Sequence, residues 1–168
     1  MDHKQFRGFI LEMTDPLYRF ALWRIGNRED AKDAVQDTFA RLWQKRRKLS
    51  QYEKPEALAF KVLRNLCIDR QRKQTINTVA WPDYEPHIPD RITPQKRMEL
   101  QEEVQNVMLN IKRLPEPQQS IYYLRHIDGM EVVEIADLLD LKVNTIHAHL
   151  SRTRKKLRSL KSKYYGSE

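Results

Sequence analysis

The sequence predicts an all-α protein made of two small helical domains joined by a proline-rich linker. Only four glycines occur in 168 residues, helix-favouring residues such as Leu, Ala, Glu, Lys and Gln are abundant, and apolar residues recur every three or four positions. Prolines then gather over residues 75–93, where no regular helix is expected. We therefore predict a domain over residues 1–74, a linker over 75–93 and a second domain over 94–168 that contains a helix-turn-helix.

Three helices are expected in the first domain. Thr14, Asp15 and Pro16 place a capping residue and a proline near the start of the first helix, and Gly26 ends it. Asn27 caps the second helix, in which apolar residues recur with a period of about 3.6. That stripe consists of Ala31, Ala34, Val35, Thr38, Phe39, Leu42 and Trp43.

A turn over residues 50–54 leads into the third helix, where Pro55 occupies a favoured first position. The inner face of this helix is expected to hold Ala59, Val62, Leu63, Leu66 and Cys67. Several basic residues fall largely outside that face, namely Lys61, Arg64, Arg70, Arg72 and Lys73.

The second domain is predicted to hold four helices. Thr93 and Pro94 start the first of them, and Pro115 opens a second that stops at Gly129. Residues 131–139 and the segment from residue 144 onward read as a helix-turn-helix, with Asp140 in a left-handed turn position. Its apolar contacts are expected from Ile135, Leu139, Leu141, Ile146 and Leu150.

Positive charge is concentrated on the last predicted helix. The chain has 31 basic and 23 acidic residues, and no acidic residue occurs from Lys142 to Lys163. If Ile146 and Leu150 face inward, the outward stripe that should meet base edges consists of His147, Ala148, Ser151, Arg152 and Lys155. Arg152 is suited to bidentate pairing with guanine, whereas Thr145 is expected to hold a phosphate. We therefore predict that this helix binds DNA.

Other classes of site find little support in the sequence. His147 and His149 lie two residues apart, so their side chains diverge on a helix and we predict no metal site. Cys67 is the only cysteine, and no signature of a catalytic or cofactor site occurs, so we predict no cofactor and no catalysis. Without an apolar run of about 20 residues or a signal peptide, we expect a soluble, cytoplasmic protein.

Three segments resemble bacterial sigma factors of the extracytoplasmic-function group. The polymerase-binding helix of that group is similar to residues 30–43, DAKDAVQDTFARLW, and its promoter-opening helix is similar to residues 64–70, RNLCIDR. Its second conserved domain resembles residues 114–154, which begin LPEPQQ. The order and spacing of the segments agree with the group, and together they cover nearly the whole chain except the linker.

The resemblance implies a transcription initiation factor whose partners are core RNA polymerase and promoter DNA. The contacts with polymerase would come from Asp33, Gln36, Asp37 and Arg41, while Phe39 and Trp43 stay in the core. Members of the group are commonly held by an anti-sigma factor, so such a protein is a further implied partner. The linker of the group runs toward the polymerase active site, and here it is acidic.

The resemblance also assigns the two promoter elements. A flipped base of the minus-10 element would be captured by Ser50, Gln51, Tyr52, Glu53 and Asn65. The adjacent backbone would be held by Arg64, Arg70, Arg72 and Lys73. Leu58 stands where relatives often have tryptophan, and Phe60 is a candidate substitute. The minus-35 element would be read as duplex by the outward stripe of the last helix, although His147 replaces a more usual basic residue.

Three alternatives account for part of the sequence. A stand-alone helix-turn-helix regulator would bind a palindrome as a dimer and without polymerase. An α-helical enzyme, such as a nuclease, would use His147 and His149 with a metal ion. A helical adaptor that binds only proteins would tolerate charge reversal at Arg152 and Lys155.

Overall fold

The computed structural model describes residues 1–73 and 93–165, and all regular elements within them are helices. The chain divides into two compact units, Met1–Tyr84 and Glu85–Glu168. The predicted all-α class is therefore confirmed. The predicted linker, except for Thr93, lies outside the described residues.

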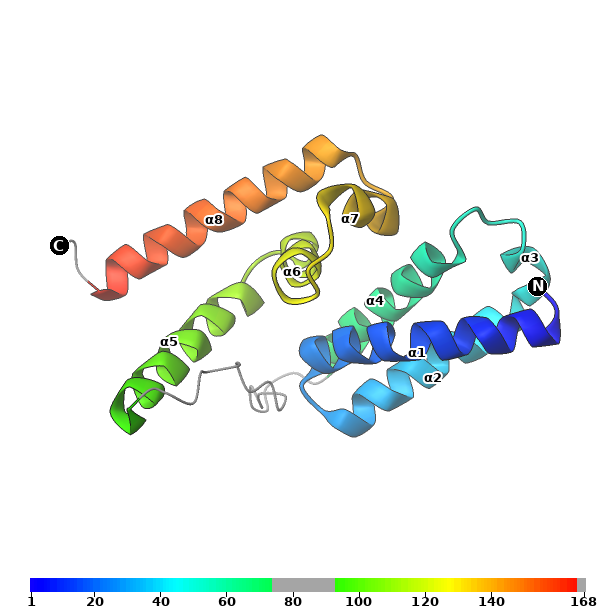
Figure 1. Ribbon diagram of the computed structural model, residues 1–168, viewed down its shortest axis with the longest axis horizontal. Helices are drawn as coiled ribbons and strands as arrows, with labels where there is room; N and C mark the ends of the chain where they lie inside the picture. Colours follow the sequence, from blue (N-terminus) through cyan, green and yellow to red (C-terminus); the bar gives the residue numbers. More distant parts are fainter. Residues whose placement is uncertain (74–92, 166–168) are drawn as a thin grey trace. The chain divides into compact units, whose positions relative to one another are not determined.

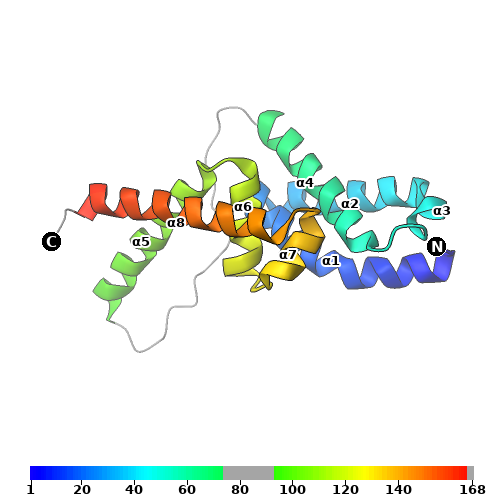
Figure 2. The same cartoon turned by 90° about the horizontal axis from the view of Figure 1, so that it is seen from above.

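The first unit is a packed group of three long helices and one short helix (Figures 1 and 2). These are α1 (His3–Ile25), α2 (Arg28–Gln44), α3 (Arg46–Leu49) and α4 (Pro55–Lys73). Helices α1, α2 and α4 contact one another pairwise. Phe20, Leu42 and Leu63 are almost completely buried between them, and the ring of Phe20 lies 4.4 Å from that of Phe60.

Helix α1 begins much earlier than the sequence predicted. Its N-cap is Asp2, whose carboxylate accepts a hydrogen bond from the backbone N–H of Gln5 at 2.7 Å, while the Gln5 side chain accepts one from the backbone of Asp2. Phe6 and Phe9 are buried and give this first half its apolar face. The predicted start near Thr14 is wrong, and Pro16 lies inside the helix because the packing outweighs its missing N–H.

The boundary between α1 and α2 agrees with the sequence. Gly26 adopts φ 80°, a left-handed conformation that glycine tolerates without steric cost, and its N–H bonds the carbonyl of Leu22. The side chain of Asn27 then caps α2 by accepting a hydrogen bond from the N–H of Asp30 at 3.0 Å. The two helices are thereby turned back alongside each other.

The apolar stripe of α2 is only partly buried. Ala31, Ala34, Val35, Thr38 and Leu42 are buried, and the hydroxyl of Thr38 donates to the carbonyl of Ala34 at 2.8 Å. Phe39 and Trp43 are half-buried instead, so their prediction as core residues is wrong. They lie at the edge of the stripe, facing the first turns of α1. A groove of about 370 Å³ opens there, lined by His3, Phe6, Arg7, Ile10, Phe39, Ala40 and Trp43.

Helix α4 follows the predicted pattern closely. Ala59, Leu63, Leu66 and Cys67 are buried as expected, while Val62 is half-buried. Phe60 is also buried, against Phe20. Its ring therefore offers no exposed aromatic surface that could replace the tryptophan found in relatives at the position of Leu58.

The second unit contains α5 (Pro94–Lys112), α6 (Glu116–Tyr122), η1 (Tyr123–Ile127), α7 (Val132–Leu139) and α8 (Val143–Tyr165). The side chain of Thr93 caps α5, as predicted. After α6 the chain continues as a π-helical turn, in which the N–H of Asp128 bonds the carbonyl of Tyr123 at 3.0 Å. Gly129, at φ 75°, then separates this turn from α7.

Helices α7 and α8 form the predicted helix-turn-helix (Figures 1 and 2). Asp140 ends α7 at φ 55° and ψ 47°, which is the left-handed conformation expected from its position. Ile135 and Ile146 are completely buried between the helices. Leu141, which follows this turn, remains 36% exposed, so its prediction as a packing residue is wrong.

Leu49 is expected to stabilise the first unit because its side chain is completely buried and is the only buried one on α3. Leu49→Ala should lower the free energy of unfolding by about 2–5 kcal/mol. Urea titration followed by tryptophan fluorescence, in a Trp81→Phe background, measures this unit, because the two remaining tryptophans, Trp23 and Trp43, both lie in it. Leu11→Ala is the control, since Leu11 is 72% exposed and its loss should change stability by less than about 0.5 kcal/mol. Equal effects of the two substitutions would contradict the assigned packing.

Candidate nucleic-acid interface

One face of α8 presents the residues that were predicted to meet base edges. His147, Ala148, Ser151, Arg152 and Lys155 are all exposed, whereas Ile146 and Thr153 are buried on the opposite side. The hydroxyl of Thr153 lies 3.5 Å from the side-chain oxygen of Gln118, which ties α8 to α6. Thr145 is half-buried at the start of the helix. The fold therefore presents one polar, positively charged stripe at the second helix of a helix-turn-helix.

The two histidines of α8 lie in different surroundings. His147 is exposed, while His149 is half-buried and its Nδ1 has no hydrogen-bond partner within the described residues. Nor do residues 1–73 and 93–165 bring three His, Cys, Asp or Glu side chains together as metal ligands.

His126 lies in the π-helical turn next to Arg125, whose guanidinium pairs with the Glu131 carboxylate at 3.1 Å. Burial lowers the pKa of His126, and the neighbouring Arg125 and Arg154 lower it further because they disfavour another positive charge. His126 is therefore neutral near pH 7.

The residues expected to form the minus-10 pocket lie on two elements, the turn over residues 50–54 and helix α4. Residues 50–54 form an exposed turn between α3 and α4, in which Tyr52 is 52% exposed. The turn is fixed on α3, because the N–H of Gln51 bonds the carbonyl of Lys48 at 2.9 Å. Asn65 and Arg72 are exposed on α4 and Arg64 is half-buried, while the side chain of Lys73 lies outside what the structure describes.

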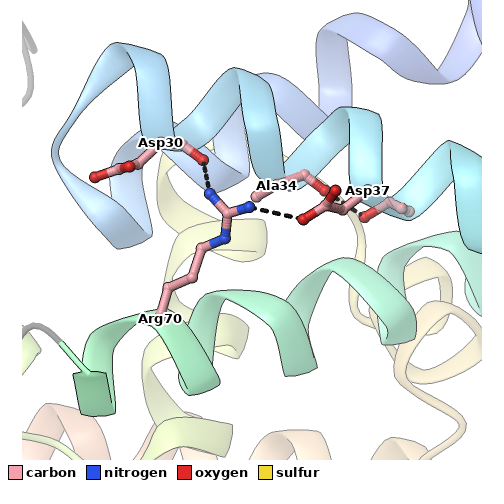
Figure 3. A network of polar contacts seen from close by, with 5 residues as sticks. Asp30, Ala34, Asp37 and Arg70 are labelled. Carbon is pink, nitrogen blue, oxygen red and sulfur yellow. Dashed lines mark hydrogen bonds and ion pairs between the residues drawn. The ribbon is translucent and has the colours of Figure 1, made fainter.

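Arg70 is held by α2 rather than directed freely to solvent (Figure 3). One guanidinium nitrogen donates to the backbone carbonyl of Asp30 at 2.7 Å, and another contacts the Asp37 carboxylate at 2.8 Å. The Arg70 side chain is 23% exposed. This geometry argues against Arg70 as a DNA contact. It also pairs Arg70, which was predicted to contact DNA, with Asp37, which was predicted to contact polymerase.

A second tie fixes the same end of α4 to α1. Gln71 accepts a hydrogen bond from the guanidinium of Arg24 at 3.0 Å and donates its amide to the Arg24 carbonyl at 2.6 Å. Arg24 is only 3% exposed. The last turn of α4 is therefore oriented by directional bonds to both neighbouring helices. Sequence reasoning missed Gln71, because a lone glutamine in a polar stretch gives no distinguishing pattern.

Comparison with known proteins gives two matches that follow this division of the chain. The family Sigma-70 region 2 matches residues 9–76, and Sigma-70, region 4 matches residues 105–157. The ECF RNA polymerase sigma factor SigW of Bacillus subtilis is 24% identical over 166 residues, covering 94% of this chain and 89% of that protein. The chain belongs to the extracytoplasmic-function group of sigma factors.

Two further relatives are consistent with this membership. The ECF RNA polymerase sigma factor SigE of Mycolicibacterium smegmatis is 27% identical over 164 residues, which cover 92% of this chain and 61% of that protein. The solved structure of the sigma factor RpoE of Bartonella quintana, in complex with the anti-sigma factor NepR, has a similar fold. Its TM-score is 0.60 at 22% identity, with 94% of this chain and 96% of that chain covered.

As a sigma factor, the protein directs transcription initiation from promoters, and its two units correspond to two conserved regions. Region 2 contains all of α2, α3 and α4, and region 4 contains α7 and the part of α8 up to residue 157. The sigma factor exposes on α2 the residues that were predicted to contact polymerase: Asp33, Gln36, Asp37 and Arg41. No helix within the described ranges combines the length and apolarity needed to cross a bilayer.

Sequence reasoning also overlooked a run of basic residues directly after α2. Lys45, Arg46, Arg47 and Lys48 are consecutive, and all except the half-buried Arg46 are exposed. The Arg46 guanidinium lies 4.2 Å from the centre of the Trp43 ring and donates to the Trp43 carbonyl. Four consecutive basic residues were visible in the sequence, but α3 was not expected as a separate helix, so their exposure was not inferred.

The Arg70–Asp37 pair should stabilise the sigma factor more than a fully exposed pair does. A double-mutant cycle with Arg70→Ala and Asp37→Ala should give a coupling energy of about 1 kcal/mol in urea unfolding, because Arg70 is largely shielded from water. The control cycle uses Arg19 and Asp15 on α1, whose side chains are 51% and 75% exposed and whose coupling should be about 0.3–0.5 kcal/mol. A larger coupling in the control would contradict the structural role of Arg70.

Proposed function

We propose that this sigma factor reads a minus-35 element as duplex with α8 and captures the non-template strand of a minus-10 element with its first unit. The exposed face of α8 carries this proposal, because its polar residues stand on the second helix of a helix-turn-helix whose other face is buried. Arg152 would pair with guanine, and His147, Ala148, Ser151 and Lys155 would line the same groove. Thr145 would hold a phosphate at the start of the helix.

For the minus-10 element, the proposed pocket combines Asn65 with the turn residues Ser50, Gln51, Tyr52 and Glu53. A preformed polar pocket offsets the few kcal/mol needed to unstack a base. Arg64, Arg72 and Lys73 would hold the adjacent phosphates. Arg70 is removed from this set, since its guanidinium is bonded to α2, and is proposed instead to position α4.

Polymerase is the proposed platform that makes these weak contacts specific. Asp33, Gln36 and Arg41 are exposed and available for docking, and Asp37 remains half-exposed beside Arg70. Each small unit reads a short element and binds it weakly alone. The combined affinity for the promoter becomes high when polymerase presents both units on one promoter. The chemistry of the chain itself is binding, without a catalytic step. The proposed place of action is the cytoplasm, where bacterial polymerase and promoter DNA meet.

An anti-sigma factor is a further proposed partner. The structurally similar RpoE was solved in complex with the anti-sigma factor NepR. The exposed faces of α2, α4 and α8 that are proposed to bind polymerase and DNA are the surfaces that such an inhibitor would need to cover.

In vitro transcription tests the proposal, with core polymerase and genomic fragments as templates. Start sites should appear only when the sigma factor is added. Arg152→Ala should weaken promoter binding by about 1–3 kcal/mol, because a bidentate contact to guanine is lost. Arg154→Ala is the matched control, since it removes an exposed arginine from a different side of the same helix. An equal loss in both variants would contradict base readout by Arg152.

Asn65→Ala should impair promoter opening while minus-35 binding is retained, because only the captured base loses its partner. Permanganate footprinting of unpaired thymines measures opening. Asn106→Ala, an exposed asparagine on α5, is the control. Specific binding of a palindrome without polymerase would favour the stand-alone regulator instead, and unaffected promoter binding after charge reversal at Arg152 and Lys155 would favour the adaptor.

A further inference from the structure

The first unit carries a cluster of positive charge on α3 and on the residue that precedes it, and the proposed contacts do not use this cluster. Lys45, Arg47 and Lys48 are exposed, and within residues 1–73 and 93–165 none of them forms an ion pair. No acidic residue occurs between Asp37 and Glu53 in the sequence, so neighbouring carboxylates along the chain do not neutralise this cluster. We call these three residues the α3 cluster.

The backbone of α3 holds the α3 cluster in place. The completely buried side chain of Leu49 anchors the helix to the core, and the N–H groups of Lys48 and Leu49 both bond the carbonyl of Lys45. Arg46 does not belong to the cluster, because its guanidinium is already occupied by the Trp43 ring and carbonyl. The three remaining cations lie on this short, anchored helix and on its N-cap residue, Lys45.

The α3 cluster is directly continuous with the turn proposed to capture the flipped base. The N–H of Gln51 bonds the carbonyl of Lys48 at 2.9 Å, that of Tyr52 bonds the carbonyl of Leu49 at 3.2 Å, and the Ser50 hydroxyl donates to the carbonyl of Arg47 at 3.2 Å. A strand whose base is held in this turn has phosphates on both sides of it. Along the chain, the turn is flanked by α3 on one side and by α4 on the other.

We propose that Lys45, Arg47 and Lys48 form a second phosphate-binding surface for single-stranded promoter DNA, which holds the backbone beyond the captured base. This inference rests on the proposed capture of the minus-10 strand. Since Arg70 is bonded to α2, α4 supplies fewer free cations than its sequence indicates, and the α3 cluster restores positive charge beside the turn. Two of its three members, Arg47 and Lys48, are joined to the turn through their backbone carbonyls.

A nucleic acid fits this surface better than a protein does. Lysine is depleted in protein interfaces, whereas single-strand binding surfaces follow the backbone with exposed cations. An apolar protein segment would instead be expected over the neighbouring aromatic groove, whose lining includes Phe6, Phe39 and Trp43 but no member of the α3 cluster. Protein binding at the cluster is therefore the competing outcome of the test.

The test compares wild-type holoenzyme with the double variant Arg47→Gln/Lys48→Gln. The probes are fork-junction DNAs from a promoter found by in vitro transcription: one has a non-template strand that ends at the minus-10 element, and the other extends single-stranded beyond it. The slope of log K against log salt is negative, and for single strands each lost phosphate contact makes it less steep by about 0.7. The variant should therefore reduce the steepness by about 1.4, and only on the extended probe.

Arg19→Gln/Lys96→Gln is the matched control, because it removes two exposed positive charges elsewhere on the chain. It should leave both slopes unchanged. Unaltered slopes in the Arg47→Gln/Lys48→Gln variant, an equal change on both probes, or a loss of core polymerase affinity instead of DNA affinity would each overturn the proposed phosphate surface. Failure to find any sigma-dependent promoter would overturn the proposed function itself, before this comparison is made.

Discussion

The packing of α1, α2 and α4 around one apolar centre is the interaction on which the first unit depends. Phe20, Leu42 and Leu63 are almost completely buried there, which fixes the rotation of each helix about its own axis. Rotation in turn decides which side chains face outward, so the exposure of Asp33 on α2 and of Asn65 on α4 follows from burial on the opposite faces. The same holds for α8, where Ile146 is the buried counterpart of the exposed stripe.

Local signals made much of the fold predictable from the sequence. Gly26 and Asn27 mark a helix end and a helix start through their own backbone and side-chain chemistry, and Asp140 was expected in the left-handed turn that it adopts. The exposed face of α8 was predictable as well, because a period of about 3.6 assigns each residue to a side once Ile146 is placed inside.

Features that depend on contacts between distant segments were not predictable in this way. The start of α1 at His3 depends on Phe6 and Phe9, whose burial requires the other helices. This burial outweighs the preference of Pro16 for a position at a helix start. Trp43 has the right periodicity for the core but lies at its edge. Arg70 reads as a free cation in a basic stretch, since its partner Asp37 lies 33 positions away in the chain.

The bond between Arg70 and Asp37 also constrains how this protein can diverge from its relatives. Replacing Asp37 alone leaves the largely shielded guanidinium of Arg70 without its counter-charge, so a change at position 37 is expected to be accompanied by a change at position 70. One of these positions lies on the surface proposed for polymerase and the other on the helix proposed to carry the captured strand. Adaptation to a new polymerase and adaptation to a new promoter are therefore not independent evolutionary paths in this chain.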